Sequence, residues 1–149
     1  MKPGMIGKGI VAGFVATVVL SAMMLMKHSM GLMPELDPIA MITAIAGASS
    51  PAVGWIGHFA IGSIFWGVGF AIVSPYLPGP SWSRGVIFAA GAWVMMMTVV
   101  MPMAGYGLFG FGLGTMTPVA TLVLHAIFGL VLGGVYGMLS DKQRSIAPG

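Results

Sequence analysis

Four long apolar stretches that contain no charged residue limit what this chain can fold into. They lie at about residues 9–26, 53–73, 85–103 and 119–139. Each is close to the roughly 20 residues that an α-helix needs to cross the hydrocarbon core of a bilayer. Only 6% of the 149 residues are charged, whereas soluble domains carry roughly 25%. The sequence therefore predicts an all-α membrane protein with four transmembrane helices in a single integral domain, residues 1–149.

Two uncharged segments between the spans are predicted to lie at the membrane surface. The first follows Asp37 and Pro38, which suit the N-cap and the first position of a helix, and its apolar run is too short to cross. We expect a short interfacial or partly re-entrant helix at about 38–47. The second segment, residues 104–118, has glycines between Tyr, Leu and Phe. We expect it to lie against the membrane or to fold back into the protein.

The basic residues indicate how the spans are oriented. With four spans both termini lie on one side of the membrane, and that side holds most of the Lys and Arg. These residues are Lys2, Lys8, Arg84, Lys142 and Arg144, whereas the opposite side holds Lys27. By the positive-inside rule, both termini are expected to be cytoplasmic. The same residues form no contiguous basic patch, so the sequence predicts the lipid bilayer, and no nucleic acid, as a partner.

A repeated pattern relates the second and fourth spans. The spacing His-x3-Gly-x4-Gly-Val starts at His58 and again at His125. The first and third spans both open with a basic residue followed by glycine, at Lys8 and Arg84. Together these matches predict two similar, parallel hairpins related by an axis along the membrane normal.

Small residues recur at four-residue spacing in the first, second and fourth spans. They are Gly9 and Gly13, then Ser63 and Gly67, then Gly129, Gly133 and Gly137. Such rows form one face of a helix and let another helix approach closely. We expect them to pack against other helices, within the bundle, in a partner membrane protein, or by self-association.

The two histidines of the repeat are the main candidates for a functional site. Both should lie about 8 to 9 Å inside the outer surface, at ~1.5 Å per residue. Each could simply hydrogen-bond across a helix interface, which contributes roughly 1 kcal/mol. An ionisable group inside a membrane is also a functional candidate. His58 and His125 could hold a haem iron between them, or bind copper together with Met33, Met101 or His28.

The remaining polar groups predict little chemistry. Glu35 and Asp37 are most simply solvated charges or helix caps, with a proton or cation entry as the alternative. The absence of cysteine excludes disulfides, thiolate metal ligands and a cysteine nucleophile. No nucleophile and base form a recognisable pair. We therefore expect no enzymatic activity and no resident cofactor, with haem or copper as the alternative.

Segments that cover nearly the whole chain carry a resemblance to a known family. They are GIVAGFVATVVLSAMMLMK, GLMPELDPIAMI, GWIGHFAIGSIFWG, SPYLPG, RGVIFAAGAWVMMM, VVMPMAGYGLFG and TLVLHAIFGLVLGGVYG. On these segments the chain resembles an uncharacterised family, a domain of unknown function, of small bacterial four-helix membrane proteins. The resemblance implies a location in the bacterial cytoplasmic (inner) membrane and brings no catalytic residues.

These observations favour one functional class over two others. We expect a non-enzymatic accessory or assembly subunit that packs against partner helices, because small-residue faces are abundant. The first alternative is a membrane protein that binds haem or copper through its outer histidines and methionines. The second is a small transporter or channel, which would have to oligomerise to enclose a path.

Overall fold

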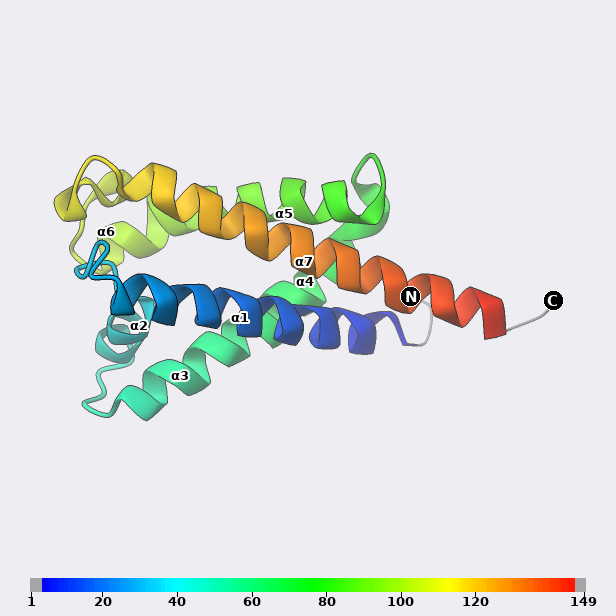
Figure 1. Ribbon diagram of the computed structural model, residues 1–149, viewed down its shortest axis with the longest axis horizontal. Coiled ribbons are helices and arrows are strands. Elements are labelled where there is room, and N and C mark those ends of the chain that lie inside the picture. The colour runs from blue at the N-terminus through cyan, green and yellow to red at the C-terminus, as the bar shows by residue number, and fades with distance from the viewer. Residues whose placement is uncertain (1–3, 147–149) are drawn as a thin grey trace.

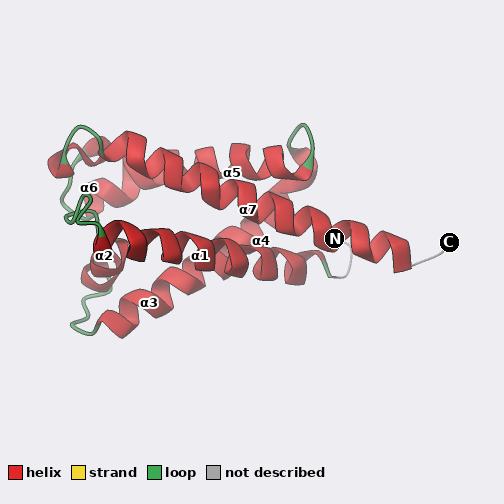
Figure 2. Cartoon of the chain, in the orientation of Figure 1, coloured by secondary structure: helices red, strands yellow, loops and turns green. Residues whose placement is uncertain are grey.

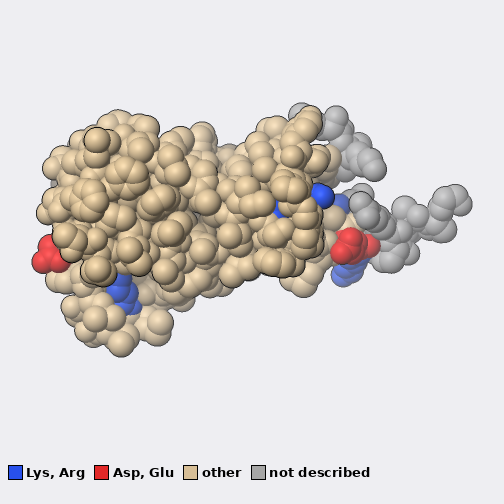
Figure 3. Space-filling view, turned by 90° about the horizontal axis from the view of Figure 1, so that it is seen from above, with Lys and Arg blue, Asp and Glu red and all other residues tan. Residues whose placement is uncertain are grey.

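The computed structural model describes residues 4–146, with side chains as far as residue 142, and within that range the chain is helical (Figure 2). Four helical segments are long and apolar enough to cross a membrane, as predicted. They are Met5–Ser29, Pro51–Tyr76, Ser81–Met103 and Thr117–Lys142. On the face seen in Figure 3, the charged side chains lie near the two ends of the molecule and the band between them is uncharged.

The first and fourth segments are continuous helices, and the middle two are interrupted. The first is α1 (Met5–Ser29) and the fourth is α7 (Thr117–Ile146). The second consists of α3 (Pro51–Ala60), the π-helical η1 (Ile61–Trp66), α4 (Gly67–Val73) and a 3-10 turn, η2 (Ser74–Tyr76). The third consists of α5 (Ser81–Met95), the π-helical η3 (Met96–Val100) and α6 (Met101–Met103).

Pro102 accounts for the interruption in the third segment. Proline has no N–H, and its ring crowds the carbonyl four residues earlier, so the helix must widen or stop nearby. Here it widens into η3 immediately before the proline and ends at Met103. The second segment has no proline between Pro51 and Pro75, so its π-helical turn has another origin.

The helices pack through glycines in two places. α1 lies against η1 and α4, and α5 lies against α7, while α1 and α7 also run side by side (Figure 1). Gly9 meets the backbone of Gly67, and an added Cβ on Gly13 would be 2.6 Å from the Gly62 carbonyl oxygen. Gly85 meets the backbone of Gly129 in the same way. At these positions a side chain would force the helices apart.

Two groups of buried side chains fill the bundle at different depths. The inner core, toward the start of α1 and the end of α7, consists of Ala12, Ala16, Phe70, Ala71, Ala89, Phe128, Leu132 and Tyr136. The methionine cluster, toward the opposite end, consists of Leu36, Met41, Met97 and Met101. The Phe70 ring contacts Tyr136 edge to face, with centroids 5.3 Å apart, and so joins α4 to α7. Packing of this kind, rather than avoidance of water, holds helices together in lipid.

The segment after α1 covers the end of the bundle that holds the methionine cluster. The expected short helix is present as α2 (Pro38–Ile45), and Asp37 caps it as predicted, accepting from the backbone N–H groups of Ile39 and Ala40 at 2.9 and 3.0 Å. The loop between the two helices closes around Lys27. Its Nζ donates to three backbone carbonyls, those of Leu32, Met33 and Leu36, at 3.1, 2.7 and 2.9 Å.

The glycine-rich segment between α6 and α7 folds back onto the same end. It contains a 3-10 turn, η4 (Leu108–Leu113), and the half-buried Tyr106, Phe109 and Leu113 pack against the methionine cluster. Phe109 has a left-handed backbone, with φ of 56°. This conformation is uncommon for a residue with a bulky side chain. Here it lets the ring lie 5.8 Å from that of Trp93.

A candidate ligand cavity between the helices

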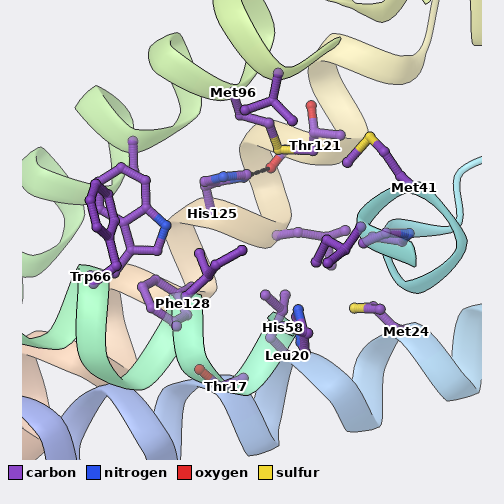
Figure 4. A pocket seen from close by; sticks show the side chains of 18 of the residues that line it. Thr17, Leu20, Met24, Met41, His58, Trp66, Met96, Thr121, His125 and Phe128 are labelled. Atoms are coloured by element: carbon purple, nitrogen blue, oxygen red, sulfur yellow. Dashed lines mark hydrogen bonds between the residues drawn. The ribbon is translucent and has the colours of Figure 1, made fainter. Parts of the chain in front are cut away.

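A cavity of about 360 Å³ lies between the inner core and the methionine cluster (Figure 4). This volume falls in the range of about 300–1,000 Å³ typical of small-molecule sites. Leu36 and Met41 line it from the α2 end, and Trp66 and Phe128 line it where the inner core begins. Nearly all the lining is apolar. His58 and His125 both line this cavity, although they lie 67 positions apart in the chain.

The cavity is open to the surroundings of the bundle. The second and third spans pack on one another chiefly near the turn that joins them, where α4 and η2 meet α5. Farther along, Ile61 and Phe65 of η1 and Met95 of α5 line the cavity and are also exposed. These residues lie within the second and third spans, which lipid would surround.

Both π-helical turns contribute to the cavity wall. η1 supplies Gly62 and Trp66, and η3 supplies Met96 and Val100. A side chain at Gly62 would overlap the hydroxyl of Thr17 on α1. Single π-helical turns inside α-helices are found frequently at functional sites, because they redirect side chains without ending the helix.

His58 is tied to α1 by a hydrogen bond whose direction follows from its neighbours. Its Nε2 lies 3.2 Å from the Ser21 hydroxyl oxygen. The single hydroxyl proton of Ser21 is donated to the Thr17 carbonyl, at 2.8 Å. The Ser21 oxygen therefore accepts, and the proton of His58 lies on Nε2. In the neutral imidazole, Nδ1 is left as an unprotonated acceptor.

His125 is held by its own helix in the opposite tautomer. Its Nδ1 lies 2.8 Å from the backbone carbonyl oxygen of Thr121. A carbonyl can only accept, so Nδ1 carries the proton, and Nε2 of the neutral ring is an acceptor. The Thr121 hydroxyl accepts from Trp93 Nε1 at 3.1 Å and donates to the Thr117 carbonyl at 2.7 Å. Each histidine thus has one nitrogen fixed by the protein and one left open.

Trp66 adds a donor to the two acceptors. Its indole N–H makes no hydrogen bond within residues 4–142, and it is not one of the fully buried polar atoms that lack a partner in that range, so it is accessible. Nδ1 of His58 and Nε2 of His125 likewise make no hydrogen bond in this range and are not fully buried. In Figure 4 the indole nitrogen lies on the edge of Trp66 that is turned toward the cavity. These three atoms are accessible and have no partner in the described part of the protein.

The other polar candidates from the sequence lie outside the cavity. His28 and Glu35 are exposed, in the last turn of α1 and the loop after it, and Asp37 caps α2. Met101 is buried in the methionine cluster, and Met33 packs on the rim of that cluster. The structure therefore brings His58 and His125 to one cavity, but not the remaining candidate ligands.

The small-residue rows lie at the helix contacts. Gly9 and Gly13 face Gly67, Ser63 and Ala71 across the contact between the first two spans. Gly129, Gly133 and Gly137 of α7 face Ser81, Gly85 and Ala89 of α5. These rows shape the walls of the bundle rather than the cavity itself.

Several cavity residues were not singled out in the sequence. Trp66 and Phe128 look like ordinary membrane aromatics, and Thr17 and Thr121 like ordinary helix hydroxyls. The sequence does indicate one polar face near the cavity, because Thr17 and Ser21 lie four residues apart and so share a face of α1. The partner of that face, His58, is set by how the helices pack, and no local pattern predicts it.

The polar and sulfur-bearing side chains of the cavity are imidazoles, an indole, threonine hydroxyls and thioethers. Among residues 4–142, no group of three or more His, Cys, Asp or Glu side chains is placed to hold a metal ion. The thioethers of Met24, Met41 and Met96 do line the cavity with the two imidazoles. No carboxylate, serine hydroxyl or lysine lines it.

Comparison with known proteins supplies a family and no activity. No curated protein and no solved structure matches the chain. The model of a family of unknown function, DUF6789, matches residues 3–147. The protein thus belongs to the DUF6789 family.

Proposed function

We propose that this protein is a non-enzymatic membrane protein that binds an apolar small molecule in the cavity between its helices. The observation that carries the proposal is the cavity itself, which is apolar, of ligand size, and open toward lipid. A molecule drawn from the membrane that fills a cavity of this size gains contacts with the atoms that line it.

A pair of leucines on α7 allows a matched test. Leu124 lines the cavity, and Leu130 on the same helix is exposed on the outer surface. Leu124→Trp should fill the cavity, and Leu130→Trp should leave it open. Each variant and the wild type would be purified from native membranes in mild detergent, and their organic extracts compared by mass spectrometry.

We expect one apolar species, present at about one per chain in the wild type and in Leu130→Trp, to fall by at least tenfold in Leu124→Trp. Bulk lipid should not change among the three. If no species is depleted in Leu124→Trp alone, the cavity holds no ligand and the proposal fails. An absorption band of haem, or bound copper, that is lost in Leu124→Trp would instead assign His58 and His125 to metal binding.

A second role, as an accessory subunit of a larger membrane complex, is favoured by the outer face of α5. Gly91 is exposed there beside the exposed Ala90, and an added Cβ on Gly91 would meet nothing within 4 Å. Glycine inside a helix is less favourable than alanine by about 1 kcal/mol. Close approach of a partner helix would explain its presence. The same purification tests this role, because the chain should elute with a larger complex, and isolation as a lone species counts against it.

We further propose that the chain lies in the bacterial cytoplasmic membrane with both termini in the cytoplasm. The distribution of Lys and Arg supports this orientation, which would place α2 and the methionine cluster on the outer side. A reporter that is active only in the periplasm should be silent when fused after Gly149 and active when inserted after Gly47, in the turn that follows α2. The reverse pattern would overturn the orientation.

A further inference from the structure

We infer that the cavity selects an apolar molecule that bears a neutral hydroxyl group, such as a membrane phenol, hydroquinone or alcohol. This inference rests on the proposed function and names the chemical class of its ligand. Three unpaired atoms carry it: the acceptors His58 Nδ1 and His125 Nε2, and the donor Trp66 Nε1.

The other hydroxyls of the cavity wall are already used within their own helices. Thr17 donates to the Gly13 carbonyl at 2.7 Å, and Thr121 donates to the Thr117 carbonyl at 2.7 Å. In helix interiors such bonds satisfy the hydroxyl proton internally. Neither threonine can therefore donate to a ligand, and the Thr121 oxygen already accepts from Trp93. The Trp66 indole is the side-chain donor left in the cavity, and the Thr17 oxygen remains an acceptor beside the two imidazole nitrogens.

These atoms discriminate between ligand head groups. A hydroxyl can donate its proton to His125 and accept from Trp66, so it meets both kinds of group. A carbonyl can accept from Trp66 but leaves the histidine acceptors unpaired. A carboxylate has no proton to donate at neutral pH, and it would bury a charge, since no lysine or arginine lines the cavity.

The aromatic wall suits a ring that carries this hydroxyl. Trp66 and Phe128 both line the cavity, and aromatic rings gain from offset or edge-to-face contacts with another ring. A hydroquinone has two hydroxyls, which matches the two histidine acceptors, and a simple phenol or polycyclic alcohol has one. The shared chemistry is the neutral hydroxyl, and the experiment separates these sources.

The test uses the full chain, stripped of its ligand and placed in lipid nanodiscs, with Leu124→Trp nanodiscs as the blank for partitioning into lipid. The probes share one decyl chain: decylbenzene, 4-decylphenol, 2-decyl-1,4-benzoquinone and its hydroquinone. Binding is measured without oxygen by titration calorimetry. Decylbenzene has no polar atom, so its binding reports whether the cavity accepts an apolar molecule at all.

We expect decylphenol to bind about tenfold more tightly than the benzoquinone, the size of effect that one unmatched polar group produces. His125→Phe should erase this preference while leaving benzoquinone affinity within about twofold. Trp66→Phe should weaken both probes alike, because its N–H can donate to either. Tighter binding of the hydroquinone than the phenol, lost in His58→Phe, would identify a diphenol; equal binding would identify a single hydroxyl.

The two levels of proposal fail separately. If decylbenzene does not bind above the Leu124→Trp blank, the cavity is not a ligand site, and the proposed function falls with this inference. If decylbenzene binds equally to the wild type, His125→Phe and Trp66→Phe, but the wild type shows no preference for the phenol over the benzoquinone, the site is real and the hydroxyl selectivity is wrong.

Discussion

Gly85→Ala is expected to destabilise the protein by about 3 kcal/mol, although alanine is the better helix former. The added Cβ would meet the Gly129 carbonyl oxygen and would lie 2.8 and 2.9 Å from the backbone N and Cα of Gly133. These are backbone atoms, which cannot rotate away as the end of a side chain can. α5 and α7 would have to separate along the contact between them.

Gly91→Ala is the matched control on the same helix. No atom lies within 4 Å of a Cβ built at Gly91. The change should leave stability unchanged or raise it by up to about 1 kcal/mol through helix propensity. Gly85→Ala should therefore lower the unfolding midpoint in detergent, followed by circular dichroism, and Gly91→Ala should leave it unchanged or raise it. Equal midpoints for the two variants would show that the helices part easily at this contact and that its glycines are not essential.

α1 offers an independent copy of this comparison. The Cβ added by Gly9→Ala would meet the Gly67 carbonyl oxygen. Gly7, two positions earlier on α1, has open space around it, so Gly7→Ala is the control. The sequence identified Gly9 as a packing residue from its spacing with Gly13. It did not identify Gly85, although Ser81 and Ala89 lie four positions to either side of it and make a row of small residues on α5.

How much of the fold could be predicted depends on which forces act locally. Four spans follow from hydropathy, because a backbone in lipid must bond internally and a run of about 20 apolar residues has few other options. The start of α2 followed from Asp37 and Pro38, whose effects reach only a few residues along the chain. The π-helical turns were not predicted. η3 has a local cause in Pro102, but η1 has no marker in its own residues.

The candidate site was less predictable, because it is made by packing. The repeat placed His58 and His125 at a common depth, and the structure places both in one cavity. Their azimuth depends on how α3 and α7 turn about their axes, which spacing does not determine. The tautomers depend on Ser21 and Thr121, and the donor Trp66 lies on a π-helical turn. The hairpin repeat stays a prediction. The π-helical turn of the first half lies in its second span, as η1, whereas that of the second half lies in its first span, as η3.

Lys27→Met is expected to loosen the loop after α1 and helix α2, which together cover one end of the cavity, while leaving the bundle folded. The ammonium of Lys27 donates to the carbonyls of Leu32, Met33 and Leu36, and Leu36 in turn lines the cavity next to α2. Methionine keeps a similar length and an apolar stem but supplies no donor. A hydrogen bond to a charged group contributes about 1.5–3 kcal/mol. Water can reach part of this loop, so we expect a net loss of about 2 kcal/mol in local stability.

Hydrogen exchange measures this loss directly. The backbone amides of Leu36 and Met41 bond to the carbonyls of Met33 and Asp37, and both should exchange roughly 30-fold faster in Lys27→Met. Lys27→Arg, which keeps a charged donor, should retain much of the protection, and Lys8→Met on the same helix should not affect it. Unchanged exchange in Lys27→Met would mean that the burial of Leu36 and Met41 alone holds this segment in place. Faster exchange at Leu36 and Met41, with slow exchange retained in the inner core, would show that the segment held by Lys27 unfolds locally while the rest of the bundle stays folded.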